Sequence, residues 1–452
     1  MELMLPRGMR DFLPEDKILR DKIADTLRST FELYGYAPLE TPAVERLDVL
    51  ASKFAGGEEI LKESFRLNDQ GGRELGLRYD LTVPLARVVG MNPQLKMPFK
   101  RYAIGNVWRD GPVAGARYRE FMQADVDVVG ASGMAADAEC LAVAKAALAK
   151  LGFEFEIFVN NRKLLNAIVE KAGIEKAKAE TTILTIDKSD KVGVKGVENE
   201  LRGKKIPEAR IEALMQLLSV RGENEEVIDG LRGELGECGA ISELRELLRY
   251  CKLFGVEVRL NVSLARGLSY YTGSIFEIFL KNSEVKSAVV AGGRYDRMIG
   301  ALLGKGWTGA DASGEGSSGA GGYPAVGLSF GVERLFDAML ERAAKEKGAA
   351  KNKNEKTKKT NTRVYVVPVQ TEAECIGFVQ KLRASGVNAD MDIIGRGPSK
   401  NLDYADRMGI PFVIVLGRKE LGKGEFALKD MLSGKERKFK ISEIKKLAEA
   451  LR

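Results

Sequence analysis

The 452-residue sequence contains no histidine at all. This absence excludes Ser-His-Asp and Cys-His nucleophile systems, an imidazole general base and an imidazole metal ligand. Any catalysis must therefore use carboxylates, arginine, lysine, tyrosine, a bound Mg²⁺ ion or the substrate itself. Histidine is uncommon in all proteins, so compositional drift explains the absence equally well.

Cysteine and long apolar runs are scarce as well. The four cysteines, Cys140, Cys238, Cys251 and Cys375, are far apart and form no Cys-x-x-Cys pair, which argues against a disulfide framework. No apolar run approaches the ~20 residues that span a bilayer. The opening MELMLPRGMRDFLPEDK has no basic-then-apolar signal region. We therefore expect a reduced, cytoplasmic protein without a membrane segment.

The remaining composition is that of a folded protein with more than one domain. It is 44% hydrophobic and 30% charged, and a single core rarely grows past roughly 250–300 residues. The net charge of +7 is uneven: residues 345–359 hold seven Lys and two Glu, and residues 362–452 hold 17 Lys or Arg against 12 Asp or Glu. The basic C-terminal part suggests nucleic-acid contact. For residues 345–361 a solvated linker is the favoured interpretation, because they contain almost no large apolar residues.

Hydrophobic spacing predicts the main elements. Apolar residues four apart predict a helix over 17–34, an Ala-rich stretch predicts another over 135–151, and the Leu- and Glu-rich residues 165–254 predict a helical module. Alternating patterns predict strands over 153–159, 257–263 and 275–280. Residues 304–322 form a Gly/Ser-rich loop. From residue 363 strands alternate with helices at 372–384 and near Tyr404, which predicts a small α/β domain.

Four segments hold the residues suited to chemistry. They are LRYDLTVPLAR at 77–87, VWRDGPVAGARYREFMQADVDVVG at 107–130, ARGLSYYTG at 265–273 with GGRYD at 292–296, and AVGLSFGVERLF at 325–336. The sequence has no GxxxxGK[ST] phosphate loop and no GxGxxG turn after a strand. A nucleotide site here would therefore differ from a P-loop or a Rossmann turn.

Arginine recurs in three of these segments beside apolar, strand-like sequence, as Arg109, Arg117, Arg119, Arg266 and Arg334. The planar guanidinium group suits bidentate contact with phosphate or carboxylate. Arg117 and Arg119 lie two apart, so on a strand they would face the same side. Each arginine alone fits a surface or ion-pair role, whereas the five together predict a polyphosphate site.

Acidic and aromatic residues accompany the arginines. Three aspartates lie among apolar residues: Asp80, Asp125 and Asp127. A half-buried carboxylate is costly without a partner, so these side chains suit an ammonium group or a basic ring. Three tyrosines, Tyr270, Tyr271 and Tyr295, offer ring contacts and hydroxyl hydrogen bonds, although core packing explains them equally well.

Together these segments resemble the histidyl-tRNA synthetase family of class II aminoacyl-tRNA synthetases. The resemblance covers nearly the whole chain from PRGMRDFLP at 6–14. The helix at 17–34 with the stretch ending at Pro42 resembles motif 1, which builds the dimer interface in the family. Residues 101–130 resemble motif 2, and GVER with Arg334 resembles motif 3. ARGLSYYTG and GGRYD resemble the more specific histidine signatures, and LRYDLT resembles the archaeal and eukaryotic form of a third marker.

The resemblance implies an α+β fold. It would contain a class II antiparallel sheet core flanked by helices, a helical insertion and a C-terminal α/β anticodon-binding domain. The implied division of the chain is a catalytic core with motifs 1 and 2 over 1–164, the insertion over 165–254, the rest of the core over 255–344, a Lys-rich linker over 345–361 and the anticodon-binding domain over 362–452.

The resemblance also implies roles for individual residues. Arg109 and Arg266 would be catalytic, both at the α-phosphate of ATP. ATP would be bound by Arg109, Arg117, Arg119, Phe121 and Arg334, with Phe121 and Arg334 on either side of the adenine. Histidine would be bound by Asp80, Thr82, Arg109, Gln123, Asp127, Arg266, Tyr270, Tyr271 and Tyr295. Within this set Asp80, Thr82 and Gln123 would hold the amino group, and Asp127 and Tyr271 the ring nitrogens. No metal ligands are implied, and Mg²⁺ would accompany ATP.

The implied protein is a homodimeric histidine–tRNA ligase. It would activate L-histidine with ATP to histidyl-adenylate and transfer histidine to the 3′ end of histidine tRNA. Neither step requires a histidine side chain. The alternative is a non-catalytic regulatory or tRNA-binding paralogue. Regulatory subunits of ATP phosphoribosyltransferase share the core but lack the anticodon domain and several motif arginines, whereas Arg109, Arg266 and Arg334 are all present here.

Some positions depart from the family pattern. Ser269 stands where Asp is usual, Met122 replaces a His or an aromatic residue, Ala116 replaces a Gly, and the 304–322 loop is longer than usual. The Ser269 change bears on the positioning of Arg266.

A histidine-charging enzyme without histidine also has a distinctive property, because it can be translated when charged histidine tRNA is scarce. Selection, drift or design would each produce such a sequence.

Overall fold

The computed structural model describes residues 2–51, 61–113, 117–266, 270–303, 323–349 and 358–451. The chain forms two compact units, Met1–Arg10 with Ile23–Glu341 and Asp11–Lys22 with Arg342–Arg452. Ala116, Ser269, the loop at 304–322 and most of the Lys-rich segment lie outside the described residues. No helix in the described ranges is long and apolar enough to cross a membrane.

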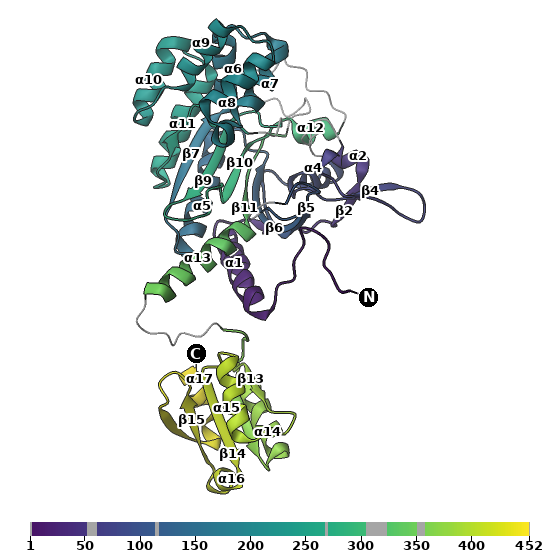
Figure 1. Ribbon diagram of the computed structural model, residues 1–452, viewed down its shortest axis with the longest axis vertical. Coiled ribbons are helices and arrows are strands. Elements are labelled where there is room, and N and C mark those ends of the chain that lie inside the picture. Colours follow the sequence, from purple (N-terminus) through teal and green to yellow (C-terminus); the bar gives the residue numbers. More distant parts are fainter. Residues whose placement is uncertain are drawn as a thin grey trace. The chain divides into compact units, whose positions relative to one another are not determined.

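An eight-stranded sheet forms the centre of the larger unit (Figure 1). Its order is β1-β5-β6-β11-β10-β9-β7-β8, with parallel pairing only of β1 with β5 and of β7 with β8 among the described strands. The strands are β1 (Ala37–Pro38), β5 (Phe99–Trp108), β6 (Glu120–Val129), β7 (Phe155–Asn161), β8 (Arg259–Leu260), β9 (Ser274–Leu280), β10 (Val290–Arg294) and β11 (Ala325–Gly331). The predicted antiparallel core is therefore present.

Helices pack on this sheet through the apolar faces that their sequences predict. Helix α1 (Pro14–Leu33) buries Ile23, Leu27 and Phe31, and the Phe31 ring lies 5.4 Å from that of Phe330 on β11. Helix α5 (Met134–Lys150) buries its Ala-rich face, and α13 (Val332–Ala349) follows β11 directly. The same unit contains a separate three-stranded sheet and two further helices: β2 (Val44–Arg46), β4 (Glu74–Leu77), β3 (Arg66–Asn68), α2 (Leu47–Leu50) and α4 (Thr82–Met91). Helix α12 (Met298–Leu302) packs against α4 in the apolar cluster around Leu85.

The chain between β7 and β8 is helical, and Figure 1 shows these helices gathered together. They are α6 (Arg162–Lys171), α7 (Lys176–Ile186), α8 (Ser189–Gly203), α9 (Glu208–Leu218), α10 (Asn224–Leu235) and α11 (Gly239–Leu253). Their shared apolar core extends to Val262, Leu264 and Ala265. The helical module therefore packs directly on the segment that leads to Arg266.

One predicted strand is much shorter than expected. The strand expected over 257–263 shrinks to β8, because the Asn261 side chain accepts hydrogen bonds from the Ser263 N–H (3.1 Å) and hydroxyl (2.8 Å) and turns the chain. Arg117 and Arg119 lie just before β6. The Arg119 N–H donates to the Gly8 carbonyl, whereas its own carbonyl accepts a hydrogen bond of 2.8 Å from the Arg109 N–H.

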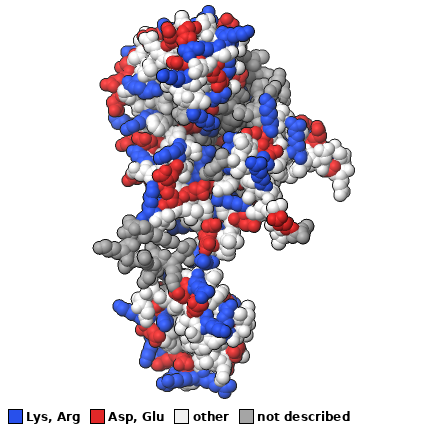
Figure 2. All heavy atoms as spheres, viewed as in Figure 1, with Lys and Arg blue, Asp and Glu red and all other residues white. Residues whose placement is uncertain are grey.

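The C-terminal unit contains its own sheet of five described strands in the order β13-β12-β14-β15-β16. Its elements are β12 (Val364–Val369), α14 (Glu372–Ala384), β13 (Ala389–Met391), α15 (Pro398–Arg407), β14 (Phe412–Gly417), α16 (Arg418–Lys423), β15 (Glu425–Asp430), β16 (Glu436–Lys440), η1 (Ile441–Glu443) and α17 (Ile444–Leu451). The predicted alternation of strands and helices is correct. Strands β15 and β16 add to the edge of the sheet in antiparallel pairing. On the face shown in Figure 2, basic and acidic side chains are interspersed over this unit.

Candidate active site

One cavity in the larger unit is lined by all nine residues that the sequence assigns to histidine. They come from four parts of the chain: Asp80 and Thr82 at the start of α4, Arg109, Gln123 and Asp127 from the β5–β6 region, Arg266, Tyr270 and Tyr271 before β9, and Tyr295 after β10. The fold thus brings together residues that are up to 215 positions apart in the sequence, between Asp80 and Tyr295.

Strand β6 supplies the polar floor of the cavity. Gln123, Asp125 and Asp127 alternate along it and therefore face the same side. Opposite them on β11, Ser329 accepts a hydrogen bond of 2.8 Å from the Gln123 amide. Gly327 pairs with Asp127, and a Cβ atom there would lie 2.0 Å from the Asp127 carboxylate. Glycine at this position is thus what leaves space for the acid.

Asp127 is held from two sides. Its carboxylate forms a buried ion pair with Arg101 at 2.7 Å and accepts a hydrogen bond from the Tyr295 hydroxyl. Burial raises the pKa of Asp127, and the nearby Arg101 opposes that rise. The carboxylate is therefore oriented before any ligand arrives, and it suits a ring N–H donor. Arg101 is a supporting residue that sequence reasoning missed.

Asp125 is the least satisfied acid of the site. It is 2% exposed, and its Oδ1 atom has no hydrogen-bond partner. Burial raises the pKa of Asp125 to about 7, with Arg101 opposing and the charge of Asp127 adding to the rise. The sequence marks Asp125 as an acceptor, but the family resemblance gave it no role. Its alternation with Gln123 and Asp127 is the signal that places it in the cavity.

Asp80 joins the cavity to helix α4. Its Oδ1 atom accepts hydrogen bonds from the backbone N–H groups of Thr82 (3.0 Å) and Val83 (2.9 Å). Burial raises the pKa of this carboxyl group, and those two hydrogen bonds work against the rise. Because both contacts use the same oxygen, Oδ2 remains for a cationic ligand group.

Three arginines converge at this cavity: Arg109 and Arg266 line it, and Arg334 lies near both. Arg109 lies over the Tyr79 ring at 4.2 Å and over the Phe121 ring at 5.1 Å. Arg266 pairs with Glu277 at 2.5 Å. The Arg334 guanidinium donates to a backbone carbonyl, and its pKa is lowered by burial and by the positive charges of Arg109 and Arg266. Such mutual repulsion is relieved by a polyanion, as a polyphosphate site requires.

The other residues assigned to ATP lie outside the cavity lining. Arg117 pairs with Glu63 at 2.8 Å and its side chain is about half exposed. Arg119 pairs with Asp110 at 2.9 Å and donates to the Gly111 carbonyl. Phe121 packs against an apolar cluster around Val107. The structure places Arg109, rather than Arg334, over the Phe121 ring.

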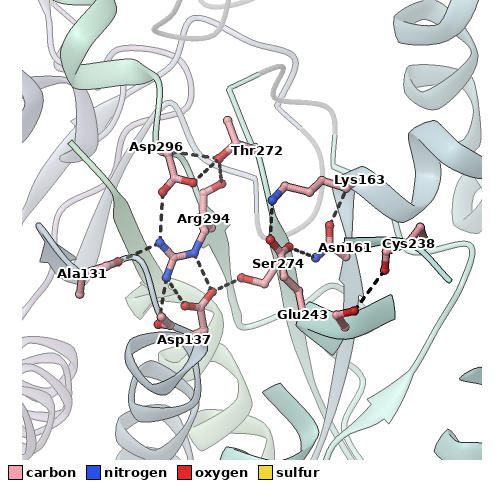
Figure 3. Close-up of polar contacts among 12 residues, drawn as sticks. Ala131, Asp137, Asn161, Lys163, Cys238, Glu243, Thr272, Ser274, Arg294 and Asp296 are labelled. Atoms are coloured by element: carbon pink, nitrogen blue, oxygen red, sulfur yellow. Dashed lines mark hydrogen bonds and ion pairs between the residues drawn. The ribbon is translucent and has the colours of Figure 1, made fainter. Parts of the chain in front are cut away.

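A buried ion-pair network supports the tyrosines, and sequence reasoning missed it (Figure 3). Arg294 of GGRYD is 3% exposed and pairs with Asp137 and with Asp296, the latter at 3.1 Å. Asp296 in turn accepts a hydrogen bond from the Thr272 hydroxyl at 3.2 Å. Thr272 follows Tyr271 and Asp296 follows Tyr295 in the sequence. Arg294 therefore holds the backbone beside both tyrosines through its contacts with Asp296 and Thr272. An arginine inside an otherwise apolar, glycine-rich strand was the available signal.

Comparisons with known proteins agree with this architecture. The family model described as "Histidyl-tRNA synthetase" matches residues 8–335, and the one described as "Anticodon binding domain" matches residues 363–451. The histidine–tRNA ligase 1 of Bacillus cereus is 37% identical over 449 residues, covering 98% of this chain and 99% of that protein. The crystal structure of histidyl-tRNA synthetase from Nostoc sp. is 28% identical with a TM-score of 0.81, and covers 99% of this chain and 100% of that chain.

A further structure shares the fold alone. It is titled as an ATP phosphoribosyltransferase regulatory subunit/histidyl-tRNA synthetase from Bacillus halodurans, is 23% identical with a TM-score of 0.72, and covers 92% of this chain and 99% of that one. The two family matches together define a synthetase core followed by an anticodon-binding domain. The chain belongs to the histidyl-tRNA synthetase family. The family and the fold class predicted from the sequence are thereby confirmed.

Proposed function

We propose that this chain activates L-histidine with ATP and then transfers the histidyl group to the 3′ end of histidine tRNA. Membership of the family makes it a histidine–tRNA ligase, whose substrates are histidine, ATP and tRNA. The observation that carries the proposal in detail is the single cavity formed by the nine histidine-assigned residues, bordered by converging arginines.

In this proposal the acidic and tyrosine side chains bind the substrate histidine. The free oxygen of Asp80, with Thr82 and Gln123, holds the ammonium group. Asp127 and Tyr271 contact the two ring nitrogens, and Tyr270 and Tyr295 form the walls. The buried pair with Arg101 supports this role for Asp127, because it fixes the carboxylate in one orientation.

The arginines act on ATP. Arg109 and Arg266 contact the α-phosphate, Arg117 and Arg119 contact the outer phosphates, and Phe121 and Arg334 hold the adenine. A histidine carboxylate oxygen attacks the α-phosphorus and pyrophosphate leaves. Fixed cations lower this barrier because negative charge builds on the phosphate oxygens. Mg²⁺ carried by ATP would shield the same charge. The terminal ribose hydroxyl of the tRNA then attacks the histidyl carbonyl and AMP leaves.

The organisation of the molecule belongs to the same proposal. The catalytic core would occupy 1–164 and 255–344, the insertion 165–254, the linker 345–361 and the anticodon-binding domain 362–452. Residues 17–42 resemble motif 1, which supports a homodimer, and the family's role in translation supports a cytoplasmic location. Sedimentation of the purified protein tests the dimer.

Substitution of Arg266 separates the ligase from a non-catalytic paralogue. Arg266→Ala should lower histidine-dependent ATP–pyrophosphate exchange about 10²–10³-fold, while tRNA affinity stays unchanged. The matched control is Arg259→Ala, an arginine on β8 whose side chain is 71% exposed, and it should keep full exchange. An Arg266→Ala protein that exchanges like wild type would remove Arg266 from the catalytic step. A wild-type protein without exchange would favour the paralogue.

A further inference from the structure

Asp125 occupies the middle of the row of β6 side chains that lines the histidine cavity. Gln123 precedes it and Asp127 follows it on the same face of the strand. The proposed function assigns Gln123 to the ammonium group of histidine and Asp127 to the imidazole ring. A histidine molecule that contacts both must therefore pass over Asp125, to which no part of the substrate is assigned.

Two acceptor atoms of this row have no polar partner among the described residues. They are Oδ1 of Asp125 and Oε1 of Gln123, and both atoms are buried. The Gln123 amide nitrogen is already used, because it donates to the Ser329 hydroxyl at 2.8 Å. A buried acceptor without a donor costs free energy. The row therefore favours a ligand that brings N–H donors to these two oxygens.

The charge of Asp125 is only partly balanced by its surroundings. Its register partners, Ser329 on β11 and Ala103 on β5, are uncharged. Arg101 forms its ion pair of 2.7 Å with Asp127 instead. Burial, opposed by Arg101 and reinforced by Asp127, raises the pKa of Asp125 to about 7. The charged and titratable groups that act on Asp125 come from β5, β6 and the segments that precede α4 and follow β10: Arg101, Asp127, Arg78, Asp80 and Tyr295.

We propose that Asp125 is a further substrate-binding residue, whose Oδ1 atom accepts a hydrogen bond from the α-ammonium group of histidine and whose carboxyl proton passes to solvent as that group binds. This inference rests on the proposed function, which makes histidine the substrate. Of the side chains assigned to the ammonium group, Thr82 and Gln123 are neutral and only Asp80 is an acid. Asp125 supplies a second carboxylate. A cationic donor beside Asp125 favours its charged form, so that binding and proton release are linked.

This linkage gives histidine binding a measurable dependence on pH. Because the pKa of Asp125 is about 7, the ammonium group should displace about half a proton from it at pH 7. On account of Asp125 alone, the affinity for histidine should fall about tenfold between about pH 8 and about pH 6. The imidazole ring of the ligand titrates in the same range, so the experiment has to separate the two contributions.

The test compares the wild type, Asp125→Asn and a control, Asp337→Asn, in the full-length protein. Asp337 lies on α13 outside the histidine cavity, and burial raises the pKa of its carboxyl group as well. The ligands are histidine and 3-(imidazol-4-yl)propionate, which keeps the ring and the carboxylate but lacks the ammonium group. Calorimetric titration in buffers of different ionisation enthalpy, without ATP or tRNA, measures both affinity and proton release.

With the wild type, histidine should release about half a proton more than the propionate at pH 7. Asp125→Asn should abolish this difference and weaken histidine binding roughly tenfold to a hundredfold at about pH 8, as expected for a lost hydrogen bond to a charged group. That deficit should shrink about tenfold at about pH 6, where the wild-type carboxyl group is protonated. The propionate should bind both proteins equally at the lower pH, and Asp337→Asn should behave as the wild type does.

Three results would overturn the proposal. Equal proton release by the two ligands on the wild type would show that the ammonium group does not reach Asp125. An equal loss of affinity for both ligands in Asp125→Asn would assign the residue to the shape of the cavity. Unchanged histidine affinity in that variant would leave Oδ1 to a bound water molecule.

Failure of the proposed function is a separate result. It would appear as a wild type without histidine-dependent ATP–pyrophosphate exchange, whereas the calorimetry uses no ATP and would still report histidine binding and proton release.

Discussion

The buried ion pair between Arg294 and Asp137 allows a quantitative test of how the tyrosine positions are held. Arg294→Met keeps most of the aliphatic volume but removes the guanidinium. Asp137, which is fully buried, then retains only the Ser274 hydroxyl. Breaking a buried pair from one side costs about 3–5 kcal/mol of unfolding free energy. The Arg294→Met/Asp137→Asn double variant removes the orphaned charge and should recover about 1–3 kcal/mol of that loss.

Urea unfolding followed by tryptophan fluorescence measures this effect in the larger unit alone. Trp108 lies on β5 of that unit, and the sequence has no tryptophan within 11–22 or 342–452. The matched control is Arg46→Met, which removes a surface partner of Asp48 and should leave the urea midpoint almost unchanged. A loss below about 1 kcal/mol for Arg294→Met, or strict additivity in the double variant, would refute the reasoning. The KM for histidine should rise in parallel.

Three other outcomes follow from the site and the composition. Because the raised pKa of Asp125 lies at about 7, its contribution to stability is present at low pH and is lost as pH rises through that value. Asp125→Asn should therefore stabilise the unit more at pH 8 than at pH 5.5, on the order of 1–2 kcal/mol; equal shifts in urea midpoint would contradict this. Gly327→Ala places a Cβ atom 2.0 Å from the Asp127 carboxylate and should raise the KM for histidine at least about tenfold with little change for ATP, whereas Gly133→Ala, in open space, should not. In histidine-starved cells, synthesis of this chain should persist longer than that of a variant carrying added histidine codons; equal decay by pulse labelling would leave drift or design as the explanation.

Local patterns predicted those elements whose burial repeats along the chain. Apolar residues four apart locate α1, because three of them form its buried face. Helix α14 has the predicted bounds, Glu372–Ala384, and Gly386 with a φ of 79° follows its end, as is common after helices. Strand β8 ends early because one asparagine turns the chain, and β15 was missed although it buries Phe426 and Leu428 in alternation, since its other residues are largely charged or small.

The sequence likewise predicted only some of the residues of the site. The nine histidine-assigned residues lie in recognisable motifs, so the sequence locates them. Their supporting partners do not, because they depend on strand register and on contacts between distant segments. Arg294 and Asp137 are separated by 157 positions, and no local pattern connects them. The field of the converging arginines likewise depends on the fold, since single arginines in a sequence predict only surface ion pairs.

The most direct test of the central claim is ATP–pyrophosphate exchange on the purified full-length protein, with histidine and with each other amino acid in turn. A working ligase should show exchange that requires histidine alone, which would also show that Ser269 is tolerated. Exchange with another amino acid, or no exchange although histidine binds, would contradict it. In the latter case Ser269→Asp distinguishes a weakened ligase, which regains exchange, from a non-catalytic paralogue, which does not.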